Sequence, residues 1–321
     1  MSSKRKRRRS RSSSSSSSTR PRETQVVEED DNVTAGKGGK AGKTKAEPPT
    51  RTPESPFPTL GKSMARGLRV VGASPQILAT AFLGVLATWG VFVAIGAEPD
   101  PRAMSLLLSA PPVHAFIDAP VALSPGESGL FSGLVVAGFA ALRGITFALL
   151  ILLIVQGLRE DGTSVRQALR ALPRRAVVLG GLYLVQFALV VAAFQLLVGF
   201  LGQLAVLAIA AGLYFLAFAP IVAAAEGVRP REALRRGFRA ARLPGTRHLS
   251  MAMAYFLVLF YSGAIAPFSG LAAATPSMAV WAYSLVLTYV HVSVLAAFTY
   301  RWLEVRDQVP ATPATPAVRG D

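Results

Sequence analysis

The chain alternates between long apolar blocks and short polar segments that are rich in arginine. Six of the blocks approach or exceed the ~20 apolar residues that an α-helix needs to cross a hydrocarbon core of about 30 Å. A buried helix in a soluble protein is usually shorter and keeps a polar stripe. The pattern therefore predicts an all-α, polytopic membrane helix bundle. Its six transmembrane helices are expected at about 75–97, 134–158, 176–200, 203–225, 249–268 and 277–300.

Residues 1–70 differ in composition from the membrane domain expected over 71–303. They combine the low-complexity stretch KRKRRRSRSSSSSSS with the acidic EEDD and the flexible GKGGKAGKTK. Such a segment buries too little apolar surface to offset the entropy of ordering, so we expect a disordered tail. Its basic clusters could bind anionic lipid, acidic protein partners or nucleic acid, of which nucleic acid is the least expected for a membrane-embedded chain. A second disordered tail is expected over 304–321.

The basic residues of the loops predict how the helices are oriented, because loops rich in Lys and Arg stay in the cytoplasm. With six spans, the loops 159–175 and 226–248 share one side with both tails and hold most of the arginines near the span ends. The opposite loops hold only Arg102. We therefore expect both termini in the cytoplasm. The Ala-, Arg-, Gly- and Pro-rich composition is typical of a bacterial gene of high GC content, which predicts a multi-pass protein of the bacterial plasma membrane.

Both arginine-rich loops have the periodicity of a short amphipathic helix. In TSVRQALRALPRR (163–175), Thr163 or Ser164 can cap the start. Over 228–243, Pro230 suits the first helical turn. Beside a bilayer, such a helix lies in the headgroup plane, where its arginines can bind anionic lipid phosphates; the alternative is a solvated loop that only fixes topology. The arginines expected to contact lipid are Arg166, Arg170, Arg174, Arg231, Arg235, Arg239 and Arg242.

The two loops also resemble each other in sequence. GTSVRQALR (162–170) matches GVRPREALR (227–235) at five of nine positions, with an offset of 65 residues. Both copies fall on the same side of the membrane in the expected topology. The match indicates a duplicated unit of span, interfacial helix and span.

The segment FLAFAPIVAAAEGVRPREALRRGFRAAR (215–242) resembles a diffuse set of bacterial six-span membrane protein families of uncharacterised function. The set includes the membrane domain associated with glycerophosphoryl diester phosphodiesterases. The resemblance covers about 144–262 and departs from the pattern at Gly237 and Phe238, where Ser and Trp are usual. It implies a six-span membrane domain. It implies no phosphodiesterase activity, because no such catalytic domain is recognised in the chain.

Arg143 and His291 form a possible intramembrane polar site, because ionisable groups inside a bilayer are costly unless they have partners. A second span over about 138–158 would place Arg143 near the outer end, where its side chain can reach the interface. A span over 131–153 would make it central and require a partner or an aqueous cavity. Glu226 lies at the end of the fourth span and is expected to pair with nearby arginines.

No motif in the sequence indicates catalysis. There is no Gly-rich phosphate loop followed by lysine, no HExxH, no acidic cluster for magnesium and no cysteine, so we expect neither a cofactor nor a metal, and an enzyme is not favoured. The first hypothesis is a non-enzymatic module that organises anionic lipids or partner proteins at the cytoplasmic face. The alternative is a passive or partner-driven, permease-like transport component. A cavity lined by Arg143 and His291 would favour transport, and a tightly packed bundle would favour the module.

Overall fold

Helices account for nearly all of the chain that the computed structural model describes, which confirms the all-α class for that part. The described residues are 55–94, 100–106, 108, 129–159, 162–197, 211–268 and 277–309. They belong to the unit Arg51–Asp321. The Ser-rich stretch, the acidic EEDD and most of the predicted C-terminal tail lie outside these residues.

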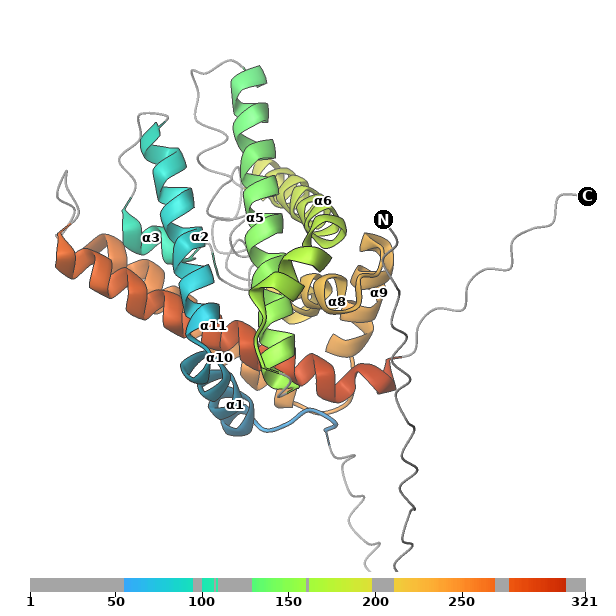
Figure 1. The fold of residues 1–321 in the computed structure, drawn as a ribbon. Helices are drawn as coiled ribbons and strands as arrows, with labels where there is room; N and C mark the ends of the chain where they lie inside the picture. Colours follow the sequence, from blue (N-terminus) through green and yellow to red (C-terminus); the bar gives the residue numbers. More distant parts are fainter. Residues whose placement is uncertain are drawn as a thin grey trace, which may run out of the picture. The chain divides into compact units, whose positions relative to one another are not determined.

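The helices follow one another along the chain as Figure 1 shows. They are α1 (Leu60–Ala73), α2 (Pro75–Ala94), α3 (Pro101–Leu106), α5 (Gly129–Leu158), α6 (Val165–Leu197), α8 (Phe218–Glu226), α9 (Pro230–Ala241), α10 (Arg247–Phe268) and α11 (Met278–Val305), followed by the short 3-10 helix η1 (Arg306–Gln308).

Among the described residues, three helical stretches are long and apolar enough to cross a membrane. They are Pro75–Ala94, Ala140–Leu158 and Met278–Gln308, and they correspond to the first, second and sixth expected spans. A shorter apolar helical stretch, Ala211–Glu226, falls on the fourth. The third, fourth and fifth spans stay predictions, and residues 198–210 and 269–276 beside them lie outside the described ranges.

Helix α1 differs from the sequence analysis, which assigns residues up to 70 to a disordered tail. The chain is helical from Leu60, and Thr59 caps this helix through its hydroxyl, which accepts from the backbone N–H of Lys62 at 3.4 Å. One face of α1 is buried against α11. A Cβ on Gly67 would lie 2.3 Å from the carbonyl oxygen of Ser293, so glycine permits this close approach. The sequence analysis missed this helix because its apolar face is narrow and the rest of the segment is polar.

Helix α6 joins two elements that the sequence analysis separates. The expected interfacial helix over 163–175 and the start of the third span form one continuous helix of 33 residues, with Pro173 inside it. Proline removes one backbone hydrogen bond from a helix interior and often ends the helix, which is why the sequence favoured a boundary there. The start is as expected, because the backbone N–H of Gln167 donates to the hydroxyl of Ser164 at 3.4 Å.

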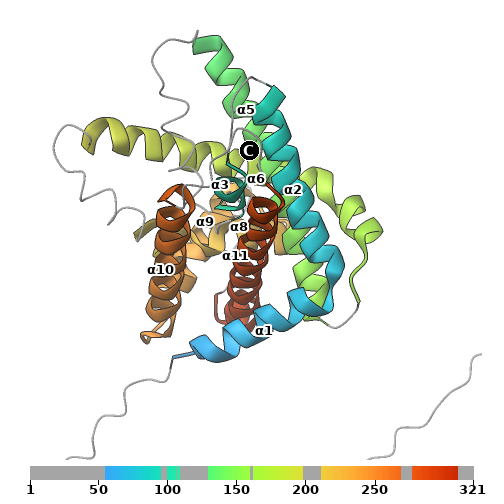
Figure 2. The same ribbon diagram turned by 90° about the vertical axis from the view of Figure 1, so that its left-hand side faces the viewer.

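The core of the described unit lies where α5 packs against α2, α6 and α8, and where α11 packs against α1 and α3. Helices α2 and α5 lie side by side in Figures 1 and 2. Gly144 lets α5 approach α6 closely, since a Cβ there would lie 2.5 Å from the carbonyl oxygen of Ala176. The close helix–helix contacts of this core thus depend on small residues.

Large apolar side chains also lie exposed on the outer faces of these helices. Leu83 of α2 is 64% exposed and Phe260 of α10 is 61% exposed. Val177 of α6 and Val286 of α11 are exposed as well. On helices that are expected to cross a membrane, such exposed apolar side chains would face lipid.

Candidate functional site

Helices α6 and α9 begin with the same local geometry, as their sequence match predicts. Gly162 and Gly227 both have a positive φ, 74° and 68°, and each stands three residues before the first residue of its helix. Such a left-handed conformation favours glycine because it lacks a Cβ. Ala168 and Ala233, again 65 residues apart, are both buried. The two segments thus share a left-handed glycine and a buried alanine at matching positions, but they differ in length, because α6 has 33 residues and α9 has 12.

The seven arginines expected to contact lipid are all exposed in this arrangement. They are Arg166, Arg170 and Arg174 on α6, and Arg231, Arg235, Arg239 and Arg242 on and beside α9. Helices α6 and α9 contact each other. The side chain of Arg175 on α6 lies against the turn before α9, because a Cβ on Gly227 would be 3.6 Å from its Nε atom. We call these seven residues the basic surface.

Small residues hold α9 tightly against α8. Ala233, Gly237 and Ala240 are buried on the inner face of α9. A Cβ on Gly237 would lie 2.8 Å from the backbone nitrogen of Ala219, so any larger residue would push the two helices apart. This contact explains why a residue without a side chain suits position 237. It also fixes which side of α9 faces outward.

A polar cluster of Glu226, Arg236 and Trp302 joins α8, α9 and α11. Arg236 forms an ion pair with Oε2 of Glu226, and the Nε1–H of Trp302 donates to Oε1 of the same carboxylate at 3.0 Å. The Arg236 guanidinium also lies over the Trp302 ring, 5.2 Å from its centroid. A largely buried carboxylate with these partners is well satisfied. Glu226 therefore pairs with an arginine, as the sequence analysis expects.

Arg236 itself is a residue whose structural role the sequence analysis missed. It lies among the arginines of the loop 226–248, which were expected to be solvated or at the membrane surface. Its side chain is instead almost fully buried. Its place in the helix carried the signal, because position 236 falls three residues after Ala233 and four before Ala240, on the buried face. Arg301 is likewise buried, and donates to the hydroxyl of Ser63 and the carbonyl of Arg247.

Phe238 is the aromatic residue of α9 that lies beside the basic surface. It is 42% exposed, stacks on Phe215 with ring centroids 5.1 Å apart, and lies under the guanidinium of Arg242 at 5.5 Å. The helical periodicity of 228–243 predicts Phe238 on an apolar face with Ala233, Leu234 and Ala241, opposite the arginines. In the structure it neighbours them, so the exposed side of α9 offers both cations and an aromatic ring.

The possible intramembrane site does not come together as one cavity among the described residues. Arg143 is buried between α5 and α6 and lies over the ring of Tyr183, 5.4 Å from its centroid. The hollow that it lines with Gln186 holds only about 20 Å³, close to the space of one or two water molecules. His291 is buried between α10 and α11, where Nδ1 lies 3.3 Å from the hydroxyl of Tyr255. The two side chains therefore have separate surroundings.

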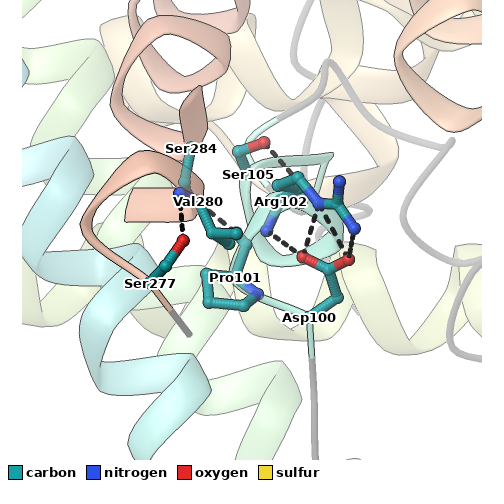
Figure 3. Close-up of polar contacts among 7 residues, drawn as sticks. All are labelled: Asp100, Pro101, Arg102, Ser105, Ser277, Val280 and Ser284. Atoms are coloured by element: carbon teal, nitrogen blue, oxygen red, sulfur yellow. Dashed lines mark hydrogen bonds and ion pairs between the residues drawn. The ribbon is translucent and has the colours of Figure 1, made fainter. Parts of the chain in front are cut away.

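Arg102, the basic residue of the loops expected on the opposite side, is held by a neighbouring carboxylate. Figure 3 shows its guanidinium against Asp100, with Nε 2.9 Å from Oδ2. Hydrogen bonding to Asp100 raises the pKa of Arg102. The hydroxyl of Ser284 on α11 donates to the carbonyl of Pro101 at 2.8 Å, which attaches α3 to α11. The charge of Arg102 is thus paired with a carboxylate.

No group of three or more His, Asp or Glu side chains in the described ranges could hold a metal ion. No family model matches the chain, and comparisons with curated proteins and with solved structures give no match either. The resemblance to six-span membrane families therefore stays a prediction. What the site can do follows from its own geometry, which is an exposed basic surface on two helices with small-residue packing beneath.

Proposed function

We propose that the protein is a six-span integral membrane protein of the bacterial plasma membrane with both termini in the cytoplasm. It acts as a non-enzymatic module that organises anionic lipids at the cytoplasmic face through the basic surface. The observation that carries the proposal is that all seven of these arginines are exposed on two contacting helices, whereas the neighbouring Arg236 is buried in an ion pair.

The surroundings of the basic surface support a membrane setting. Three helical stretches are long and apolar enough to span a bilayer, and several helices expose large apolar side chains. An amphipathic helix with arginines and an aromatic residue on its accessible side is suited to the headgroup region. Arginine can bind a phosphate through two parallel N–H donors, which suits it to anionic lipids.

The strength of the attraction can be bounded. A basic residue near an anionic membrane surface contributes roughly 1 kcal/mol, and salt screens this attraction. Arg235, Arg239 and Arg242 together would contribute up to about 3 kcal/mol. This attraction would enrich anionic lipid around the protein.

The permease-like alternative would need a pathway through the helices. The volume of about 20 Å³ at Arg143 is too small for a solute larger than water. Arg143 and His291 also have separate surroundings, whereas the transport hypothesis would be favoured by one cavity lined by both. These observations support the module over the permease.

Replacing Arg235, Arg239 and Arg242 with glutamine tests the proposal. The variant should be purified in neutral detergent from native membranes, and its co-purified phosphatidylglycerol and cardiolipin measured by mass spectrometry. We expect several-fold less anionic lipid per protein than in the parent. The matched control replaces the same three residues with lysine, which keeps the charge and should retain most of the lipid. Unchanged anionic lipid in the glutamine variant would overturn the proposal.

A further inference from the structure

A second basic feature lies between α1, the end of α5 and the end of α11, and none of the seven arginines of the basic surface lines it. It is a hollow of about 530 Å³. Its cations come from three separate parts of the chain and are accompanied by a single carboxylate. These charged residues are Lys62, Arg66, Arg69, Arg159, Arg306 and Glu304.

Helix α1 supplies three of these cations from one side. Lys62, Arg66 and Arg69 lie at i, i+4 and i+7, so they share one face of the helix. The adjacent face, which includes Gly67 and Val70, is buried. Close contact of Gly67 with α11 therefore fixes the direction in which the three cations point.

The end of α5 forms a second wall. The Nη2 atom of Arg66 donates to the carbonyl oxygen of Leu158, the last residue of α5, at 3.3 Å. Arg159 follows directly and also lines the hollow. Glu304 and Arg306, at and after the end of α11, line it as well. Elements distant in sequence thus converge on one place.

The charges of the hollow indicate an anionic ligand. Five cations against the single carboxylate of Glu304 leave the hollow with an excess of positive charge, which a further negative group would compensate. The C-terminal end of α5 offers part of that compensation through its dipole. An anion bound between Arg69 and Arg159 would supply the rest.

The volume of the hollow and its remaining lining residues restrict the class of ligand further. About 530 Å³ falls in the range of sites that hold a small organic molecule, and is far larger than a simple ion needs. Glu304 would repel a second phosphate but could accept hydrogen bonds from hydroxyl groups, and Tyr300 adds a phenol beside it. This combination fits a phosphate diester that carries hydroxyls, such as a phosphoglycerol headgroup.

The place of the hollow favours a lipid as the source of that headgroup. Leu158 is the last residue of the candidate span Ala140–Leu158, and Arg306 lies near the end of the candidate span Met278–Gln308. The hollow therefore stands where two apolar helices end, which is the level of the headgroups. Leu158 and Leu303 give it an apolar side that an acyl chain can follow.

We propose that this hollow is a discrete binding site for one anionic phospholipid with a phosphoglycerol headgroup. The inference rests on the membrane setting of the proposed function but uses none of the arginines of the basic surface. Lipid bound here would be held individually, whereas the basic surface attracts headgroups collectively.

Native mass spectrometry of the full chain, released from neutral detergent micelles that contain phosphatidylglycerol, tests the site. The double variant Lys62→Gln, Arg69→Gln removes two exposed cations, and Ala65→Trp fills the hollow without changing its charge. We expect each to weaken binding of the tightest lipid by roughly tenfold or more. Ala73→Trp, on the same helix but outside the hollow, should bind like the parent. Parent-like binding by both test variants, or an equal loss in Ala73→Trp, would overturn the site.

Two further arms separate the lipid source and the two proposals. Glycerol phosphate added at the same concentration should not displace the lipid, and displacement would overturn the lipid as ligand. The variant with glutamine at 235, 239 and 242 should keep the tightest lipid while losing the bulk of its anionic lipid. Loss of the tightest lipid in that variant, with parent-like binding by the hollow variants, would overturn the hollow and leave the proposed function standing.

Discussion

The indole N–H of Trp302 donates to the Glu226 carboxylate at 3.0 Å, although the two residues are 76 positions apart in the sequence. The same carboxylate forms an ion pair with Arg236 of α9. One acidic side chain at the end of α8 thus connects α9, which carries three arginines of the basic surface, to the long apolar helix α11. We infer that this cluster determines the orientation of α9.

Glu226→Gln should destabilise the protein markedly. The substitution leaves the guanidinium of Arg236 largely buried without its counter-charge, which costs about 3–5 kcal/mol in buried ion pairs. A lower midpoint of thermal unfolding in detergent would show the effect. Asp307→Asn is the control, because Asp307 is 89% exposed and its pairing with Arg306 should contribute little.

The double variant Glu226→Gln, Arg236→Met separates the charge from the packing. Removing both charges should recover part of the stability lost in Glu226→Gln, because no buried ion is left unpaired. If Glu226→Gln alone unfolds at the midpoint of the parent, the cluster does not hold α9 in place.

Gly67→Ala should weaken the attachment of α1 to α11. The new methyl group would meet the carbonyl oxygen of Ser293 at 2.3 Å, so the helices must separate or shift, at a cost of about 1–3 kcal/mol. Limited proteolysis in detergent should then cut within α1 more readily. Gly61→Ala is the matched control, since nothing lies within 4 Å of a Cβ there. Equal proteolysis of the two variants would contradict the packing of α1 described above.

Phe238→Ser should reduce the association of α9 with anionic vesicles. The substitution removes the exposed ring beside Arg242, and because Phe238 is 42% exposed, its burial in the headgroup region would contribute on the order of 1 kcal/mol. The contact of α9 with phosphatidylglycerol-rich bilayers can be followed in the reconstituted full chain with a fluorescent label on a cysteine at the exposed position 246. Phe238→Leu keeps an apolar anchor and should preserve the signal. Equal signals from the serine and leucine variants would exclude an anchoring role.

The local features of α9 were predictable from the sequence because each depends on neighbouring residues. The prediction over 228–243 corresponds to Pro230–Ala241, with Pro230 in the first turn. Gly245 after it has a φ of 95°, as suits the predicted stop. The exposure of the arginines at 231, 235, 239 and 242 follows from the same periodicity.

Features that depend on long-range packing were not predictable in this way. The helix α1 looked like part of a polar tail, because its apolar face is narrow and matters only against α11. In the sequence, Arg236 does not differ from the other arginines of its loop, because its partners Glu226 and Trp302 come from other helices. The hollow between α1, α5 and α11 is likewise lined by cations at positions 62, 159 and 306, which are too far apart in the sequence for a local pattern to connect them.

The side of the membrane on which the basic surface lies can be measured directly, since the chain contains no native cysteine. Single cysteines at positions 13, 164 and 312 test the side expected to be cytoplasmic, and those at 109, 124 and 272 test the opposite side. With an impermeant thiol reagent on intact cells, we expect labelling of the second set alone, with the first set labelled only after lysis. Labelling of the cysteine at 164 in intact cells would place the start of α6 outside and contradict the proposed function.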